Sequence, residues 1–261
     1  MQYVRRMIVP PALRAIASLH RDALQAVFGP LQPDPAAPPP PGRMLFLCFS
    51  NRCGSNYVAQ LLASTGAFNE AGEFFNAATV LEHATASSLR SLPAYVAALP
   101  SLVPPHKVLA AKAAPDQLVM LSDCGTLDAL GPRATYVLLE RQDRVAQAVS
   151  RVIAAQNNAW STSHQATIPD SALVYDRAAI DTEWDKIARA NAAFYAFFAV
   201  NGIVPLHTTY ETVQADPQAL ADELSQRLEM PGLRIRPDSV TLRRQAGPLN
   251  TAWRQRFQSG R

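Results

Sequence analysis

The stretch that most constrains the fold of this chain is Met44–Gly66, in which a strand, a polar loop and a helix follow one another directly. The run Met44–Phe49 is apolar, the loop Ser50–Ser55 contains a glycine, and Asn56–Thr65 carries apolar side chains at helical spacing. A strand that turns tightly into a helix aims unpaired backbone N–H groups at one point, where the helix dipole adds positive potential. Such a turn binds a phosphate or a similar anion; an ordinary turn between strand and helix is the alternative.

The side chains of this loop suit an anion. Arg52 supplies charge, Gly54 lets the backbone approach a ligand closely, and Ser55 supplies a hydroxyl. The nucleotide-binding pattern GxxxxGK[ST] is absent. The phosphatase spacing of a cysteine, five residues and an arginine also fails, because Gly54 stands at that distance from Cys48.

Composition places the chain among globular proteins that bind small anions. Of its 261 residues, 48% are hydrophobic and 17% are charged, which allows a large buried core. The net charge of +3 fits an anionic small ligand and is too weak to favour nucleic acid. Three cysteines give no disulfide framework, which favours a reducing, cytoplasmic compartment. No apolar run is long enough to span a membrane.

Three segments organise the chain: an amphipathic helical arm over residues 1–29, a proline-rich linker over 30–42, and the main domain over 43–261. The arm is expected to form one helix from about Ala12, with arginines among its apolar side chains. It would either pack against the domain or a partner, or lie on a membrane surface and make the protein peripheral.

Beyond the first turn, strands and helices alternate along the chain. We expect strands at Lys107–Lys112, Thr135–Glu140 and Ile203–Tyr210, and helices near Gln117–Leu130, after a cap at Asp143, along Ile180–Phe198 and from Asp216 to Leu228. This order predicts an α/β fold with a central parallel β-sheet, helices on both faces and a ligand site at the carboxyl edge. Arg52, Lys112 and Arg141 would gather there, which is more positive charge than one anion needs and indicates a nucleotide with two phosphate or sulfate groups.

Two acidic residues, Glu70 and Glu73, stand three apart among aromatic side chains in the segment Phe68–Phe75. They are either solvated loop acids, or Glu73 is partly buried by Phe74 and Phe75. In the second interpretation desolvation raises the pKa of Glu73, which suits a general base.

The helix after Asp143 carries Gln147 and Ser150 on one face, because they are three residues apart. Gln156 and Trp160 continue its opposite, apolar side. A glutamine on that side needs a partner, so Gln156 would line a cavity; a core helix with a stray glutamine is the alternative.

The chain resembles the trehalose 2-sulfotransferase family of bacterial carbohydrate sulfotransferases (the Stf-zero type) in four segments that occur in the same order. These are SNRCGSN before the first helix, NEAGEFF, RQDRVAQAVSRVIAAQNNAW and the tail LRRQAGPLNTAW, which together span most of residues 44–257. The resemblance implies a P-loop-NTPase-like sulfotransferase fold. It also implies 3′-phosphoadenosine 5′-phosphosulfate (PAPS) as the donor, adenosine 3′,5′-bisphosphate (PAP) as the product, and no metal.

The resemblance also assigns roles to residues. Donor-binding roles fall on Arg52, Cys53, Gly54, Ser55 and Asn56 for the 5′-phosphosulfate, on Arg141 and Ser150 for the 3′-phosphate, and on Arg244 and Gln245 in the tail. Glu73 would be the general base, and Arg52 and Lys112 would assist at the sulfuryl group. Glu70, Gln147, Gln156 and Trp160 are candidates for the acceptor pocket, since a Trp face stacks on a sugar. The family loop usually reads RSGST, so Cys53 and Asn56 replace two hydroxyl side chains and leave the backbone amides.

The sequence therefore predicts a sulfotransferase that acts on a carbohydrate or glycolipid hydroxyl. A nucleotide-dependent, kinase-like transferase is an alternative, disfavoured by the missing lysine and the lack of an evident Mg²⁺ site. A non-catalytic nucleotide- or sugar-binding protein is another. The arm is not part of the family pattern and could shape the acceptor site or a homodimer.

Overall fold

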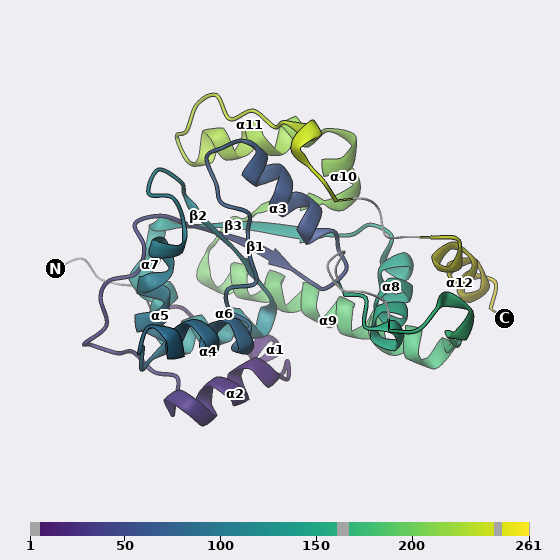
Figure 1. Cartoon of the computed structure of the whole chain (residues 1–261), viewed down its shortest axis with the longest axis horizontal. Coiled ribbons are helices and arrows are strands. Elements are labelled where there is room, and N and C mark those ends of the chain that lie inside the picture. Colours follow the sequence, from purple (N-terminus) through teal and green to yellow (C-terminus); the bar gives the residue numbers. More distant parts are fainter. Residues whose placement is uncertain (1–5, 161–166, 243–246, 261) are drawn as a thin grey trace.

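A parallel β-sheet lies at the centre of the protein (Figure 1). The structure is a computed structural model that describes residues 6–160, 167–242 and 247–260. Among these residues four parallel strands form one sheet in the order β2-β1-β3-β4. The strands are β1 (Met44–Phe49), β2 (Leu109–Ala113), β3 (Ala134–Glu140) and β4 (Leu206–Thr209). Strands β2 and β3 lie on opposite sides of β1, so β1 is the topological switch point of the sheet. In open α/β sheets ligands bind outside the carboxyl ends of the strands at such a point, and a ligand site is expected at the carboxyl end of β1.

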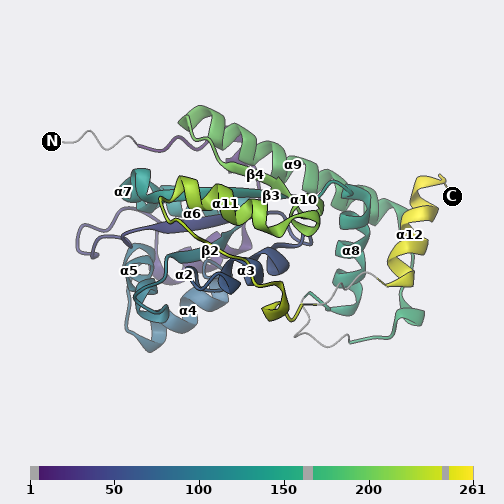
Figure 2. The ribbon, with the colours of Figure 1, turned by 90° about the horizontal axis from the view of Figure 1, so that it is seen from above.

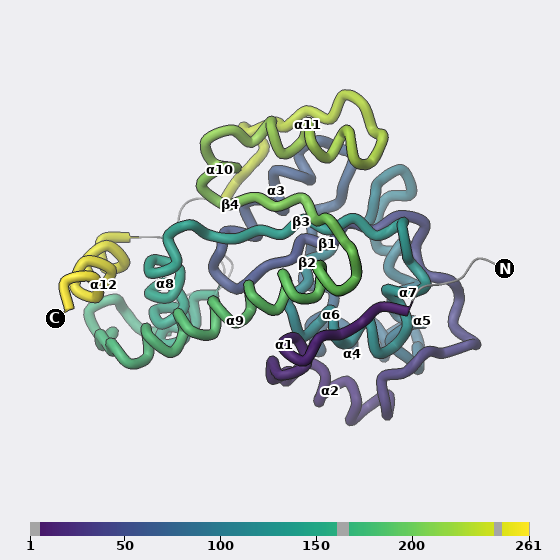
Figure 3. The backbone as a smooth tube through the Cα atoms, turned by 180° about the vertical axis from the view of Figure 1, so that it is seen from behind, coloured from purple at the N-terminus to yellow at the C-terminus, as the bar shows by residue number. Residues whose placement is uncertain are grey.

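Helices cover both faces of the sheet, as predicted (Figure 2). The α-helices are α1 (Pro11–Arg14), α2 (Leu19–Phe28), α3 (Ser55–Ser64), α4 (Ala77–Ala86), α5 (Leu92–Ala98), α6 (Pro115–Asp123), α7 (Thr126–Leu130), α8 (Arg144–Asn157), α9 (Arg177–Asn201), α10 (Tyr210–Ala215), α11 (Pro217–Arg227) and α12 (Pro248–Gln258). Helices α3 and α11 pack on one face. Helices α4 to α7 and α9 pack on the other, and from behind α9 is seen running across it (Figure 3).

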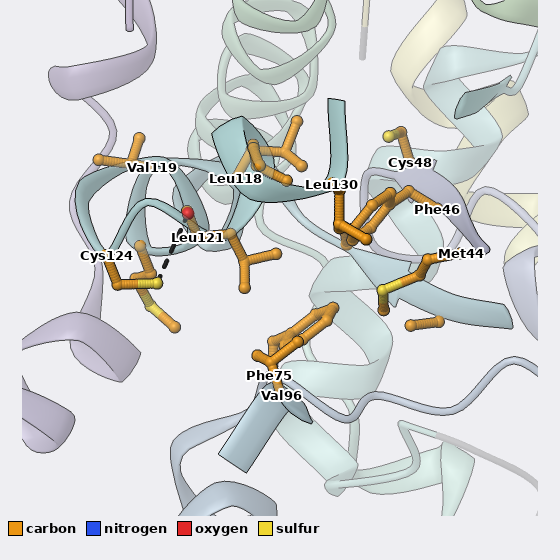
Figure 4. Packing of buried hydrophobic residues seen from close by; sticks show 14 of the residues in the cluster. Met44, Phe46, Cys48, Phe75, Val96, Leu118, Val119, Leu121, Cys124 and Leu130 are labelled. Carbon is orange, nitrogen blue, oxygen red and sulfur yellow. Dashed lines mark hydrogen bonds between the residues drawn. The ribbon is translucent and has the colours of Figure 1, made fainter. Parts of the chain in front are cut away.

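The two faces have separate apolar cores, because successive side chains of a strand point to opposite sides. Phe46 of β1 and Tyr136 of β3 stack at 5.3 Å on the α9 face. Phe75 and the α6 residue Leu118 belong to the same cluster (Figure 4). On the other face Leu47 packs with α3 and α11. The sheet is thus buried on both sides, as its apolar strands predict.

Two predicted helices are each broken in the structure. The arm forms α1 and α2 in place of one helix, with Ser18 capping α2 through Arg21 N. The helix expected over Gln117–Leu130 is interrupted at Gly125, whose φ of +75° is left-handed and ends α6 before α7 begins. The predicted caps at Asp143 and Asp216 are confirmed by their bonds to Ala146 N and Ala219 N.

The N-terminal arm is docked on the domain. Leu13 and Leu24 are fully buried in the core cluster on the α9 face. The amide of Asn201 exchanges two 2.8 Å hydrogen bonds with the backbone of Ile8. Of the two interpretations of the arm, packing against the domain is therefore the one that these contacts support. Within the described residues, no helix is both long and apolar enough to cross a membrane.

Candidate functional site

The turn between β1 and α3 has the predicted strand–loop–helix form. Arg52 and Gly54 both have left-handed φ values, +68° and +95°, which bend the chain sharply into α3. Gly54 is the N-cap residue of α3 and has no side chain to cap the first turn, an arrangement that suits anion binding by the N–H groups of a helix start. A Cβ on Gly54 would stand 2.3 Å from the ring of Tyr210, at the carboxyl end of β4. Gly54 is thus required by close packing against Tyr210 as well as by its backbone conformation.

Cys53 lies between Arg52 and Gly54 in this loop. Its side chain is fully buried in the cluster that includes α3, and burial raises the pKa of the thiol to about 12. The expected loss of a ligand-facing hydroxyl therefore does not arise, because this side chain faces the core. Cys53 can contribute to an anion site only through its backbone.

Arg52, Arg141 and Ser150 lie together at the carboxyl ends of β1 and β3, and we call them the arginine cluster. Arg52 Nε donates to Ser150 Oγ at 3.0 Å, and Arg141 Nη1 donates to the carbonyl of Arg52 at 3.3 Å. Burial, with the nearby charges of Arg141 and Arg151, lowers the pKa of Arg52. Positive charge is thus concentrated at this edge of the sheet, where Glu211 Oε1, 3.7 Å from Arg141 Nε, offsets part of it.

Two further contacts fix this cluster. Arg52 Nη1 donates to the Trp160 carbonyl at 2.7 Å. The Arg141 guanidinium lies over the Tyr210 ring at 5.3 Å, a cation–π arrangement. Tyr210 was not singled out from the sequence, although its place at the end of a strand could have indicated it.

Gln147, on α8, is fully buried and forms hydrogen bonds to the loop Ser50–Ser55, which we call the anion loop. Its Nε2 donates to Ser50 Oγ at 3.0 Å and to the carbonyls of Asn51 at 2.9 Å and Ser50 at 3.4 Å. Its Oε1 has no partner among the described residues. This placement differs from the acceptor pocket expected for Gln147, because a side chain with no exposed surface cannot touch an acceptor.

The other two acceptor candidates near α8 also lie differently from the expectation. The amide of Gln156 bonds the backbone of Val174 in both directions, at 2.8 and 2.9 Å, and so joins α8 to the segment before α9 instead of lining a cavity. Trp160 lies beyond the end of α8 and is exposed. An exposed Trp can still stack on a ligand.

Glu73 and Lys112 form an ion pair beside the loop. The segment before Glu73 runs along β2, with Gly72 paired to Ala111 and the Gly72 carbonyl accepting from Lys112 N at 2.8 Å. This pairing brings Lys112 Nζ to 3.1 Å from Glu73 Oε1, and Nζ also donates to Asn56 Oδ1 at the start of α3. The Lys112 side chain is 7% exposed and that of Glu73 is 45% exposed, so the carboxylate can reach a ligand.

The pKa of Glu73 moves opposite to the sequence-based expectation. Burial does raise it, but the Lys112 ammonium and hydrogen bonds from Lys112 and Asn76 outweigh burial, so the pKa lies below its usual 4.5. Asn76 Nδ2 donates to Glu73 Oε2 at 2.6 Å, and its own Oδ1 accepts from Gln117 at 2.8 Å. Glu73 is therefore an ionised carboxylate at neutral pH, and its pairing with Lys112 makes it a weaker base than a free carboxylate.

For the remaining expected site residues, the part of the chain that the structure describes shows no contact with the loop Ser50–Ser55. Glu70 is exposed in the segment that leads to Glu73, and the contacts that place this segment are those of Asn69, whose amide pairs with both backbone groups of Ala110. Arg244 and Gln245 lie outside the described residues. In the part of the chain that the structure describes, no three His, Cys, Asp or Glu side chains group closely enough to hold a metal ion.

Distant structural similarities accompany this site. The sulfotransferase domain from the curacin biosynthetic pathway is 14% identical, with a TM-score of 0.46, over 85% of this chain and 98% of that one. Retinol dehydratase in complex with retinol and PAP is 14% identical, with a TM-score of 0.37, over 84% and 66%. Its complex with androsterone and PAP is 13% identical, with a TM-score of 0.38, over 91% and 69%. Curated proteins yielded no match.

A sequence-family match covers more than half of the chain. Residues 115–260 match the Stf0 sulphotransferase family. The matched region contains Arg141, Gln147 and Ser150, whereas the anion loop, Glu73 and Lys112 precede it. On this match the chain belongs to the Stf0 sulphotransferase family.

Proposed function

We propose that this protein transfers the sulfuryl group of PAPS to a hydroxyl of a carbohydrate or glycoconjugate. The observation that carries the proposal is the meeting of two groups at one loop: the arginine cluster on one side, and the Glu73–Lys112 pair on the other. The loop itself joins them, because Arg52 bonds Ser150 while Asn56 accepts from Lys112.

The residues present fit a nucleotide with phosphate groups at two positions. The uncapped N–H groups of α3 suit the 5′-phosphate. Arg141 and Ser150, on β3 and α8, suit the 3′-phosphate. When bound, PAPS supplies the sulfuryl group and leaves as PAP.

The chain's own residues would act on the acceptor and on developing charge. Glu73 takes the proton of the acceptor hydroxyl as that oxygen bonds to sulfur. Lys112 and the N–H groups of α3 stabilise the phosphate oxygen that keeps the electron pair when its bond to sulfur breaks. Lys112 is already paired with Glu73, so one ammonium serves both the base and the leaving oxygen.

The proposal is tested by incubating the protein with PAPS and a panel of sugars, including trehalose, methyl glucoside and maltose, and measuring PAP and sulfated sugar. We expect PAP to appear together with a sulfated sugar, and we expect EDTA to leave the rate unchanged because cations of the chain replace Mg²⁺. PAP binding without any transfer would favour a non-catalytic binding protein. Loss of activity in EDTA that magnesium restores would contradict the metal-free mechanism.

A further inference from the structure

The first turn of α2, in the N-terminal arm, contacts the starts of α4 and α6, the helices that follow Glu73 and Lys112 in the chain. On one side, His20 Nδ1 accepts from Ala77 N at 3.2 Å, where α4 begins shortly after Glu73. On the other, Ser18 Oγ donates to Asp116 Oδ2 at 2.6 Å, where α6 begins shortly after Lys112. This turn of the arm therefore bonds the first turns of α4 and α6, each of which begins three or four residues after a member of the ion pair.

The hydrogen bond to Ala77 fixes the state of the His20 ring. Since Nδ1 accepts from a backbone N–H, the neutral ring carries its proton on Nε2. The ring is partly exposed, and the residue before it, Leu19, is 86% exposed, so this turn is open to a ligand. An exposed imidazole N–H is a suitable donor to a hydroxyl or ring oxygen of a sugar.

His20 is also close to the base. Ala77 follows Asn76, whose amide holds Glu73 Oε2. The ring thus contacts the backbone of the residue that directly follows Asn76, the side chain that holds the carboxylate.

We propose that His20 is an acceptor-binding residue, donating from Nε2 to the substrate held at Glu73, so that the arm forms one wall of the acceptor site. The inference rests on the proposed function. It names a determinant of acceptor choice that lies far before the region matched by the family, residues 115–260. The apolar docking of the arm through Leu13 and Leu24 is separate from this role.

Two substitutions separate recognition from structure. His20→Asn keeps a side-chain oxygen near the Nδ1 position, where it accepts from Ala77, and removes the N–H at Nε2. His20→Gln places an amide N–H near the Nε2 position and gives up the Nδ1 acceptor. His83→Asn, a histidine on α4 that bonds neither Ala77 nor Glu73, is the matched control.

The experiment measures KM and kcat for the best sugar of the panel at saturating PAPS, together with Kd for PAP and Tm. We expect His20→Asn to raise the acceptor KM about five- to tenfold, with PAP Kd and Tm unchanged, and His20→Gln to recover part of that loss. His83→Asn should behave as wild type. An acceptor KM at the wild-type value in His20→Asn overturns the inference, as does a raised KM in both variants that follows a fall in Tm. If the wild-type protein transfers sulfate to no sugar, the proposed function fails, and this inference fails with it.

Discussion

Gln147→Leu is the substitution that tests most directly how the anion loop is held. The side chain is fully buried, and its Nε2 donates to the hydroxyl and carbonyl of Ser50 and to the carbonyl of Asn51. Leucine keeps a similar volume and removes every donor. The change therefore isolates the hydrogen bonds from the packing.

The expected magnitude follows from those contacts. The carbonyl of Ser50 keeps its bond from Cys53 N, so the cost comes from the buried hydroxyl, which loses its donor at roughly 1–3 kcal/mol. Asn51 is exposed, so water can replace the bond to its carbonyl. If about 1–2 kcal/mol of this is needed to restore the loop when PAP binds, Kd for PAP rises roughly five- to thirtyfold. The free energy of unfolding falls by less, because the substitution also removes the buried Gln147 Oε1, which has no partner among the described residues.

Gln117→Leu is the matched control, because Gln117 is also a buried glutamine with bonded amide atoms. It accepts from Ala114 N at 2.9 Å and donates to Asn76, on the Glu73 side of the site. Calorimetry with PAP and thermal unfolding should show that both variants lose stability, whereas only Gln147→Leu loses PAP affinity. A wild-type Kd in Gln147→Leu, or an equal loss of PAP affinity in Gln117→Leu, would refute this role for Gln147.

Three further predictions concern the other site residues. Arg141→Ala and Ser150→Ala should each weaken PAP binding roughly ten- to a hundredfold and barely change binding of adenosine 5′-phosphate; equal losses for both ligands in calorimetry would contradict the 3′-phosphate assignment. Glu73→Gln should slow single-turnover transfer about 10²–10⁴-fold without changing PAP affinity, and Glu70→Gln should be milder; a wild-type rate in Glu73→Gln would require another base. Lys112→Met should move the acid limb of kcat/KM to higher pH. In wild type the base is lost only as pH falls below 4.5, through the lowered pKa of Glu73, and without the ammonium burial raises that pKa; an unmoved limb would show that Lys112 does not control the base.

The parts of the fold that could be predicted are those encoded by neighbouring residues. The apolar run of β1, followed at once by a glycine loop and a helical pattern, defines its own structure. The caps at Asp143 and Asp216 are equally local, since each carboxylate bonds a backbone N–H three residues on. The break at Gly125 was missed, although a glycine between two apolar stretches could have indicated it.

The parts that could not be predicted depend on contacts between distant segments. The expected pKa of Glu73 had the wrong sign because local sequence shows Phe74 and Phe75, but not Lys112, which arrives only when the chain pairs with β2. Helical spacing placed Gln147 on the same face as Ser150, yet it could not show that the face is covered by the anion loop. Periodicity predicts which residues share one face of a helix, but the segment that packs against that face is known only from the folded structure.

The family match covers only part of the candidate site, and its first residue separates one group of site residues from the other. Arg141 and Ser150 lie within residues 115–260, whereas Glu73 and Lys112 precede them, so the match covers the residues assigned to the 3′-phosphate but not the base. The two parts meet at the loop before α3. There Asn56 accepts from the ammonium of Lys112 and so shares it with Glu73. The amide of Asn56 thus holds Lys112 from the first turn of α3, and under the proposed function this bond would link the N–H groups that bind the donor to the charge environment of Glu73.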